Sequence, residues 1–262
     1  MHTLVLKAVL TPLLIGAASA AGRRWGHQIG GWLVALPLTS GPVAYFLATD
    51  YGTDFAAQAS TGMLAATASQ VLLALAYRST ATRGALTAFI AGTAVFAAAT
   101  LALTYLQWPA LPTFLLVLGT IGVAVALTRR TRAQHDRQPS VAKPPWWDMP
   151  ARMVVATGVV LTITTLAPII GPQLAGLLSP FPVFGVILAL FTHLTHDHHA
   201  ASAVLDGLVL GLAAPAVFFL VLSQGLAALG LSAFVLATLG ALLTQLVTMI
   251  AMERAAPRQL AT

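Results

Sequence analysis

The sequence has no cysteine and very few charged residues. Only 8% of its 262 residues are Asp, Glu, Lys or Arg, whereas 58% are hydrophobic. A typical soluble domain carries about 25% charged residues. So few charges cannot cover a water-soluble globule of this length, and most of the surface must therefore face lipid. The absence of cysteine also excludes disulfides and thiolate metal sites.

Motifs for nucleotide binding and hydrolytic catalysis are missing as well. The sequence has no Gly-rich phosphate loop, no nucleophile elbow and no HExxH pattern. The formal charge of +6 does not indicate nucleic acid, because the basic residues stand in short loops between apolar runs. We therefore expect neither an enzyme nor a nucleic-acid-binding protein, and an ATP-driven pump is disfavoured.

Long apolar runs follow one another along the chain, separated by Gly, Pro and charged residues. A run of about 20 apolar residues is long enough to cross a hydrocarbon core. The sequence therefore predicts an all-α polytopic membrane protein with about nine transmembrane helices. The expected spans are 3–21, 27–49, 55–77, 84–105, 109–128, 150–170, 173–194, 199–222 and 226–251.

The basic residues fall almost entirely on one side of these expected spans. Only Lys7 lies on the other side, together with Asp50 and Asp54. The basic side contains Arg23, Arg24, Arg78, Arg83, Arg129, Arg130, Arg132, Arg137, Lys143, Arg152, Arg254 and Arg258. Cytoplasmic loops carry an excess of Lys and Arg. We therefore expect a protein integral to a bacterial cytoplasmic membrane, with its N-terminus outside and its C-terminus in the cytoplasm.

The sequence aligns with itself, without gaps, at an offset of 145 positions. Residues 26–37 fall on 171–182, which pairs Gln28 with Gln173 and Pro37 with Pro182. An odd number of expected crossings separates equivalent points, so equivalent helices would run in opposite directions. The pattern predicts an inverted-topology pair, an arrangement that recurs among secondary transporters.

This alignment divides the chain into four parts. The first four-helix repeat covers residues 1–106, and the second, inverted repeat covers 146–252. A linker helix and a basic cytoplasmic loop occupy 107–145, and a cytoplasmic tail occupies 253–262, which gives a 4+1+4 plan. Residues 1–21 also have the pattern of a signal peptide, but their place in the repeat favours a first transmembrane helix.

The second half resembles the small four-helix membrane proteins of the GlpM type. The resemblance rests on the segment QLAGLLSPFP at 173–182 and on the helix that ends near FTH at 191–193, and it continues more weakly through Gly207 and Pro215. It implies a four-helix unit that must pair, here fused into one chain, and an association with envelope polysaccharide. It supplies no established catalytic or binding residues. The first half departs from the pattern, with LPLTSGP at 36–42.

The second and seventh expected spans are interrupted at matching positions. Proline removes a backbone donor and disturbs the preceding turn, and the freed polar groups must face protein or a water-lined cavity. Paired breaks of this kind point to a transporter's central site, although they could equally be packed kinks. The candidate substrate-binding residues are Pro37, Thr39, Ser40, Ser179, Pro182, Gly185, Gln28 and Gln173. The candidates for other interior hydrogen bonds are Gln58, Gln70, Thr100 and Gln245.

Asp206 is the one acid that we place within an expected span, beside Gly207 and Gly211. An ionisable residue within a membrane marks by default an ion pathway or a proton relay. The alternative is an acid near the cytoplasmic boundary that pairs with an Arg or a His. Its repeat partner, Thr61, is uncharged.

A turn rich in histidine, HLTHDHH at 193–199, follows the seventh expected span. His193, His196 and His199 could hold a divalent metal or respond to pH. They could also form nothing more than a polar connection between helices. We expect no metal here.

These observations favour a small secondary transporter for a small or amphipathic organic solute, with its site at the repeat interface. The expected coupling partner is a proton or another cation handled by Asp206, and no other cofactor is expected. The alternative is an accessory membrane subunit of an envelope-polysaccharide or lipid-linked export system. The chain could act as a monomer, because its repeats can pair internally, or as a homodimer.

Overall fold

The computed structural model describes residues 9, 13, 24, 26–37, 40–105, 108–132, 150, 153–154, 177 and 179–255. Throughout these ranges the regular elements are helices, without any strand, so the predicted all-α class is confirmed. The first half contains α2 (His27–Val34), α3 (Ser40–Tyr51), α4 (Thr53–Thr80), the short 3-10 helix η1 (Ala81–Arg83) and α5 (Ala85–Thr104). Then follow α6 (Ala110–Arg132), α9 (Val183–Thr195), α10 (His198–Gly211), α11 (Ala213–Leu229), η2 (Gly230–Ser232) and α12 (Ala233–Ala255).

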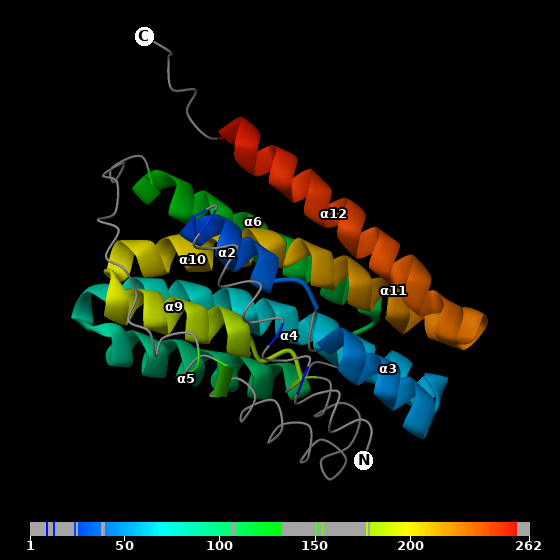
Figure 1. Cartoon of the computed structure of the whole chain (residues 1–262). Helices are drawn as coiled ribbons and strands as arrows, with labels where there is room; N and C mark the ends of the chain where they lie inside the picture. Colours follow the sequence, from blue (N-terminus) through cyan, green and yellow to red (C-terminus); the bar gives the residue numbers. More distant parts are fainter. Residues whose placement is uncertain are drawn as a thin grey trace.

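Helix α4 lies at the centre of the bundle and packs against α3, α5, α6, α10 and α11 (Figure 1). Most of its inward side chains are Ala, Gly, Ser or Thr, such as Ala59, Ser60 and Gly62. Small residues let helix backbones approach closely. Five helices can therefore surround α4, and 78% of its hydrophobic stretch is buried as a result.

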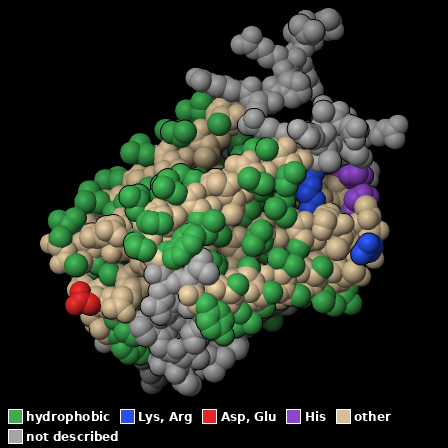
Figure 2. Space-filling view, turned by 180° about the vertical axis from the view of Figure 1, so that it is seen from behind, with side chains coloured by type: hydrophobic (Ala, Val, Ile, Leu, Met, Phe, Trp, Pro, Cys, Tyr) green, Lys and Arg blue, Asp and Glu red, His purple; other side chains and the backbone are tan. Residues whose placement is uncertain are grey.

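Helices α5, α6 and α12 form the outside of the bundle and expose large apolar side chains. Leu86, Leu115 and Leu243 are each more than half exposed, and Figure 2 shows hydrophobic side chains spread over the visible face. In the described residues, four segments are long and apolar enough to cross a membrane: Thr53–Arg83, Ala85–Leu103, Ala110–Thr128 and His198–Met252. An outer surface of this kind is compatible with a membrane-embedded protein.

The expected count of nine spans and the 4+1+4 plan are not confirmed by the described part of the chain. The expected spans 3–21 and 150–170 lie almost wholly outside it. The expected boundary between 199–222 and 226–251 is wrong, because α11 continues to Leu229 and the chain turns back only at Gly230. Gly230 has φ +57°, a left-handed conformation that glycine adopts without steric cost.

Two helix boundaries recur at the offset of 145 positions or within one residue of it. Helix α4 begins at Thr53 and α10 begins at His198, 145 positions later, while α3 and α9 end at Tyr51 and Thr195, 144 positions apart. Figure 1 shows α4 running toward the end of the bundle at which α10 begins, so these equivalent helices run in opposite directions. Unlike α4, the helical stretch that starts at α10 is interrupted at Leu212.

Pro215 explains this interruption. Proline has no N–H to donate and its ring clashes with the carbonyl four residues earlier, which here belongs to Gly211. The α10 helix accordingly ends at Gly211, and Pro215 lies in the first turn of α11, where a missing donor is tolerated. The equivalent position in α4 is Gln70, which leaves that helix continuous.

Candidate functional site

The first helix break lies between α2 and α3. The backbone amides of Ala35 and Leu36 donate to the carbonyl oxygens of Trp32 and Leu33 at 3.3 Å each, which tightens the last turn of α2. Pro37 then ends the helix, and its carbonyl oxygen accepts a 2.8 Å hydrogen bond from the amide of Gly41. Some of the backbone amides and carbonyl oxygens at the break are therefore hydrogen-bonded to each other, and a new helix begins within a few residues.

The second break precedes α9 and contains two prolines. The amide of Val183 donates to the carbonyl oxygen of Phe181 at 2.7 Å, and the amide of Val186 donates to that of Pro182 at 2.8 Å. Pro182 is the N-cap residue of α9, and no side chain caps this helix. Each break is followed by a helix of about three turns, α3 after the first and α9 after the second.

The two breaks meet around a small, partly open cavity of about 30 Å³. One water molecule needs roughly 10–15 Å³ of such space, so the cavity has room for about two. The described residues that line it are uncharged: Val34, Ala35, Leu36, Pro37, Ser40, Gln70, Pro180, Phe181, Pro182, Val183, Phe184, Gly185, Leu208, Pro215 and Phe219. The cavity is thus an uncharged space between the two halves of the chain, and Ser40 and Gln70 are its polar side chains.

The lining contains both members of several pairs at the offset of 145 positions. These pairs are Ala35 and Pro180, Leu36 and Phe181, Pro37 and Pro182, Ser40 and Gly185, and Gln70 and Pro215. If the two halves contributed unrelated segments to the lining, both members of an equivalent pair would seldom line the same cavity. The cavity therefore lies where the two halves face each other through the same segment.

Four of the predicted substrate-binding residues line the cavity, namely Pro37, Ser40, Pro182 and Gly185. Ser179 is buried in the second break but does not line it. Gln28 lies elsewhere on α2, where its carbonyl oxygen faces Gly207 of α10. Thr39 and Gln173 lie outside the described residues.

Gln70, which the sequence analysis named only as a candidate for interior hydrogen bonds, also lines the cavity. Its side-chain amide Nε2 donates to the carbonyl oxygen of Pro180 at 2.7 Å, and only 6% of the residue is exposed. This hydrogen bond ties α4, in the first half, to the break in the second half. No signal in the sequence located it beside the breaks, because the hydrogen bond joins positions 110 residues apart.

Glycines bring α2 and α10 into backbone contact. A Cβ atom at Gly31 would lie 1.8 Å from the carbonyl oxygen of Val204, and one at Gly207 would lie 1.9 Å from that of Gln28. At Gly211 the nearest atom would be the Cβ of Ala35, at 2.5 Å. Only glycine fits at such distances, so these positions fix how closely the two halves approach beside the cavity.

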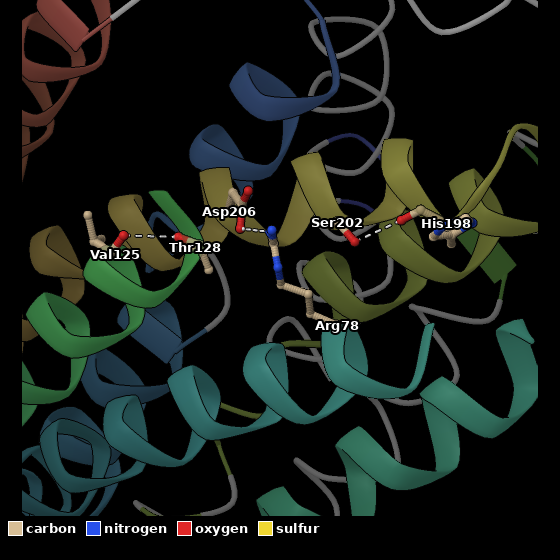
Figure 3. A network of polar contacts seen from close by, with 6 residues as sticks. All are labelled: Arg78, Val125, Thr128, His198, Ser202 and Asp206. Carbon is tan, nitrogen blue, oxygen red and sulfur yellow. Dashed lines mark hydrogen bonds and ion pairs between the residues drawn. The ribbon is translucent and has the colours of Figure 1, made fainter. Parts of the chain in front are cut away.

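Asp206 forms an ion pair with Arg78, from the end of α4 (Figure 3). The Arg78 Nη1 to Asp206 Oδ1 distance is 2.5 Å, and the side chains are 20% and 5% exposed, respectively. The pairing with a basic residue that the sequence analysis named as one alternative is therefore observed. The pair joins the two halves two residues from Leu208, a lining residue of the cavity.

The histidine turn connects α9 to α10 through ordinary hydrogen bonds. Asp197 is the N-cap of α10 and accepts a 2.7 Å bond from the amide of Ala200. His193 Nδ1 lies 3.2 Å from the hydroxyl of Tyr77, and His196 Nδ1 lies 2.9 Å from Oγ1 of Thr195. Within the described ranges, no three His, Cys, Asp or Glu residues are grouped so that they could hold a metal ion.

A comparison of the chain with protein-family models, curated proteins and solved structures finds no significant match. The resemblance to GlpM-type proteins therefore stays a prediction. The chemistry of the site has to be argued from its own residues.

Proposed function

We propose that this chain is a small secondary transporter whose solute site lies at the cavity between the two helix breaks. In this proposal the chain consists of two inverted four-helix repeats around a linker helix, with nine crossings of a bacterial cytoplasmic membrane. The N-terminus is outside and the C-terminus is cytoplasmic. The transported solute is small or amphipathic, and the movement is coupled to a proton or another cation.

The observation that carries the proposal is the pairing of equivalent residues around one cavity. A pseudo-two-fold axis between inverted repeats passes through the point where equivalent segments meet. Five such pairs line this cavity, including Pro37 with Pro182. A site on the axis can be opened to either side by two similar conformations, which is the basis of alternating access in inverted-repeat transporters.

The small volume of the cavity fits a closed state. Room for about two water molecules is too little for an organic solute, so the breaks would have to move apart before a solute entered. Pro37 and Pro182 interrupt the continuous hydrogen-bond ladder that stiffens a helix. They supply points at which α3 and α9 can tilt relative to the segments that precede them.

The distribution of charge supports the proposed orientation. Figure 2 shows Lys, Arg and His side chains at one end of the molecule and acidic side chains at the opposite end. Arg78 lies in the last turn of α4 and Arg83 in the 3-10 helix that follows, and His193 of the histidine turn lies beside Tyr77 at the same end. Asp54 lies in the first turn of α4, at the opposite end. Under the positive-inside rule, the end with Arg78 faces the cytoplasm.

The ion pair between Arg78 and Asp206 is the proposed coupling element. Protonation of Asp206 would remove its negative charge and release Arg78, which weakens one connection between α4 and α10. Because the pair spans the two halves, this change would favour their separation. Charged residues in such surroundings are costly unless paired, so proton binding and helix movement would be linked.

Single-cysteine labelling tests the proposal, since the natural chain has no cysteine. Ser40→Cys, Ser179→Cys and Gly185→Cys would be treated from either side of sealed vesicles with a membrane-impermeant thiol reagent. We expect labelling that depends on the side of addition and shifts with pH, membrane potential or solute. Ser69→Cys, which is fully buried in α4 and does not line the cavity, should resist labelling. Thr82→Cys, exposed beside Arg83, should react from the cytoplasmic side only.

Resistance at all three break positions in folded protein would reject the transport proposal. It would favour the alternative, an accessory membrane subunit of an envelope-polysaccharide or lipid-linked export system. The close packing of α2 on α10 through glycines supports the accessory-subunit alternative, because it would make the protein rigid. In that case the helix breaks would be packed kinks.

A further inference from the structure

The histidines that the structure describes gather at one end of the bundle. They are His27 at the start of α2, His193 in the last turn of α9, His196 in the turn that follows, and His198 and His199 at the start of α10. The ring centroids of His198 and His199 are 3.9 Å apart, those of His27 and His196 are 4.9 Å apart, and those of His193 and His198 are 6.4 Å apart. These five side chains form what we call the histidine cluster.

One ring contact in the histidine cluster joins the two halves of the chain. His27 belongs to the first half and His196 to the second, and the planes of their rings meet at 74°. About one turn further along α2, Gly31 lies against the backbone of Val204 in α10, so this ring contact stands beside the close approach of the two helices. The other ring contacts in the cluster lie within the second half. Movement of α2 away from the histidine turn would therefore separate His27 from His196.

Few acidic groups balance the histidine cluster. On the elements around it, the charged or titratable side chains that the structure describes are Arg24, Tyr77, Arg78, Arg83, Asp197 and Asp206. Both carboxylates have partners, because Asp197 caps α10 and Asp206 pairs with Arg78. The Tyr77 hydroxyl, an uncharged neighbour, lies 3.2 Å from Nδ1 of His193. The described surroundings thus contain more basic than acidic groups even while the histidines are neutral.

Acidification would add positive charge to this end of the bundle. Histidine is the side chain whose charge ordinarily changes between pH 5 and 8, and like charges in close contact repel. His198 and His199 are consecutive residues of one helix, so they cannot separate without unwinding its first turn. His27 and His196 can separate when α2 moves. The repulsion is therefore relieved most easily at the contact between the two halves.

We propose that the contact between His27 and His196 is a pH-sensitive switch, which holds α2 against the histidine turn when the rings are neutral and releases it when they are protonated. This inference goes beyond the proposed function, because it concerns how firmly the halves are joined and holds whether or not a solute is transported. The unfolded chain, in which the rings are far apart, binds protons more readily than the folded one. The stability from this contact is therefore complete at pH 8 and is lost as the pH falls through the histidine range.

A double-mutant cycle at two pH values tests the switch. The free energy of unfolding of the full-length protein in mixed micelles would be measured at pH 8 and pH 5, at constant ionic strength, for wild type, His27→Gln, His196→Gln and the double variant. Glutamine is polar but cannot be protonated in this range, and the cycle isolates the interaction between the two side chains. At pH 5 we expect an unfavourable coupling that changes the unfolding equilibrium about tenfold, the repulsion of two charges 4.9 Å apart near a protein surface. At pH 8 the unfavourable coupling should be absent.

The distance between α2 and the end of α9 reports the movement itself. Spin labels would be attached to Ile29→Cys, which is partly exposed on α2, and to Leu194→Cys, which is 62% exposed on α9, in the chain that has no natural cysteine. We expect longer distances at pH 5 than at pH 8, and no change with pH when His27→Gln is added. Labels on Leu86→Cys of α5 and Leu194→Cys are the control, because neither lies on α2, and their distance should be the same at both pH values.

Two further variants separate this switch from other proton-binding groups. His199→Gln removes a histidine that does not join the halves, so the coupling between His27 and His196 should persist. Arg78→Met with Asp206→Leu removes the ion pair, and the distance change should persist there as well. The switch is overturned if the coupling is equal at pH 5 and pH 8, if the distance from Ile29→Cys to Leu194→Cys does not change with pH, or if the change disappears with the ion pair. Failure of the cysteine-labelling experiment would reject transport and leave the switch intact.

Discussion

A methyl group at position 207 would test whether the two halves are held together by backbone contact between α2 and α10. In Gly207→Ala, the new Cβ would lie 1.9 Å from the carbonyl oxygen of Gln28 and 2.9 Å from the amide nitrogen of Trp32. An ordinary contact between carbon and oxygen requires about 3.3 Å or more. Neither obstructing atom belongs to a flexible side chain, so α2 itself would have to move away from α10.

This displacement would be transmitted to α12 through Trp32. The indole Nε1 of Trp32 donates to Oγ1 of Thr248 at 3.0 Å, and the Trp32 carbonyl oxygen accepts a 2.9 Å bond from Gln245 Nε2. Overpacking of a close-packed interior costs about 1–3 kcal/mol, and each weakened hydrogen bond adds about 1 kcal/mol. We therefore expect Gly207→Ala to lower the free energy of unfolding by about 2–4 kcal/mol.

The matched control is Gly122→Ala in α6, where a Cβ would meet no atom within 4 Å. Replacing glycine by alanine within a helix stabilises it by roughly 0.5–1 kcal/mol. Unfolding of the purified protein, followed by circular dichroism in mixed micelles with increasing denaturing detergent, compares the two variants. Equal stability of Gly207→Ala and wild type would refute the proposed close approach of the two halves.

Two further predictions concern the polar contacts between helices. Arg78→Ala or Asp206→Ala alone should destabilise the protein by roughly 3 kcal/mol, since each leaves a poorly solvated charge without its ion-pair partner. The double variant Arg78→Met with Asp206→Leu should recover most of this loss in the same unfolding assay, and strictly additive losses would contradict the coupling. Asp197→Ala should cost about 1 kcal/mol by removing the N-cap of α10, whereas Asp197→Asn should cost only a few tenths. Equal effects of these two substitutions would mean that the cap does not stabilise the helix.

The paired helix breaks could be predicted from sequence because proline acts locally. A proline disturbs a helix interior whatever packs around it, and the common offset of Pro37 and Pro182 indicated that the two breaks correspond. What the sequence did not contain was the identity of the residues that close the space between them. Gln70 is 110 positions from Pro180, and a hydrogen bond across that separation depends on the packing of α4.

The ends of the helices were harder to predict than the breaks. The apolar run from 199 to 251 has no charged residue except Asp206, so composition does not show where the chain turns back. Gly225 and Gly230 are both candidates, and only the second adopts a positive φ. Likewise, Asp206 was recognised as unusual from its apolar surroundings, but its partner Arg78 is supplied by another helix.

The alignment of Gln70 with Pro215 has a consequence for the energetics of the two halves. Gln70 fastens α4 to the second break, whereas proline at the equivalent position has no side-chain amide with which to fasten α11 to the first. In the proposed transporter, two identical halves would make the inward and outward movements equal in energy, and the difference at this position helps to make them unequal. We expect the first break to yield more readily, so that Ser40→Cys reacts faster than Gly185→Cys in the labelling experiment. The protein would then populate mainly one of its two proposed conformations, and the other would be a minor state.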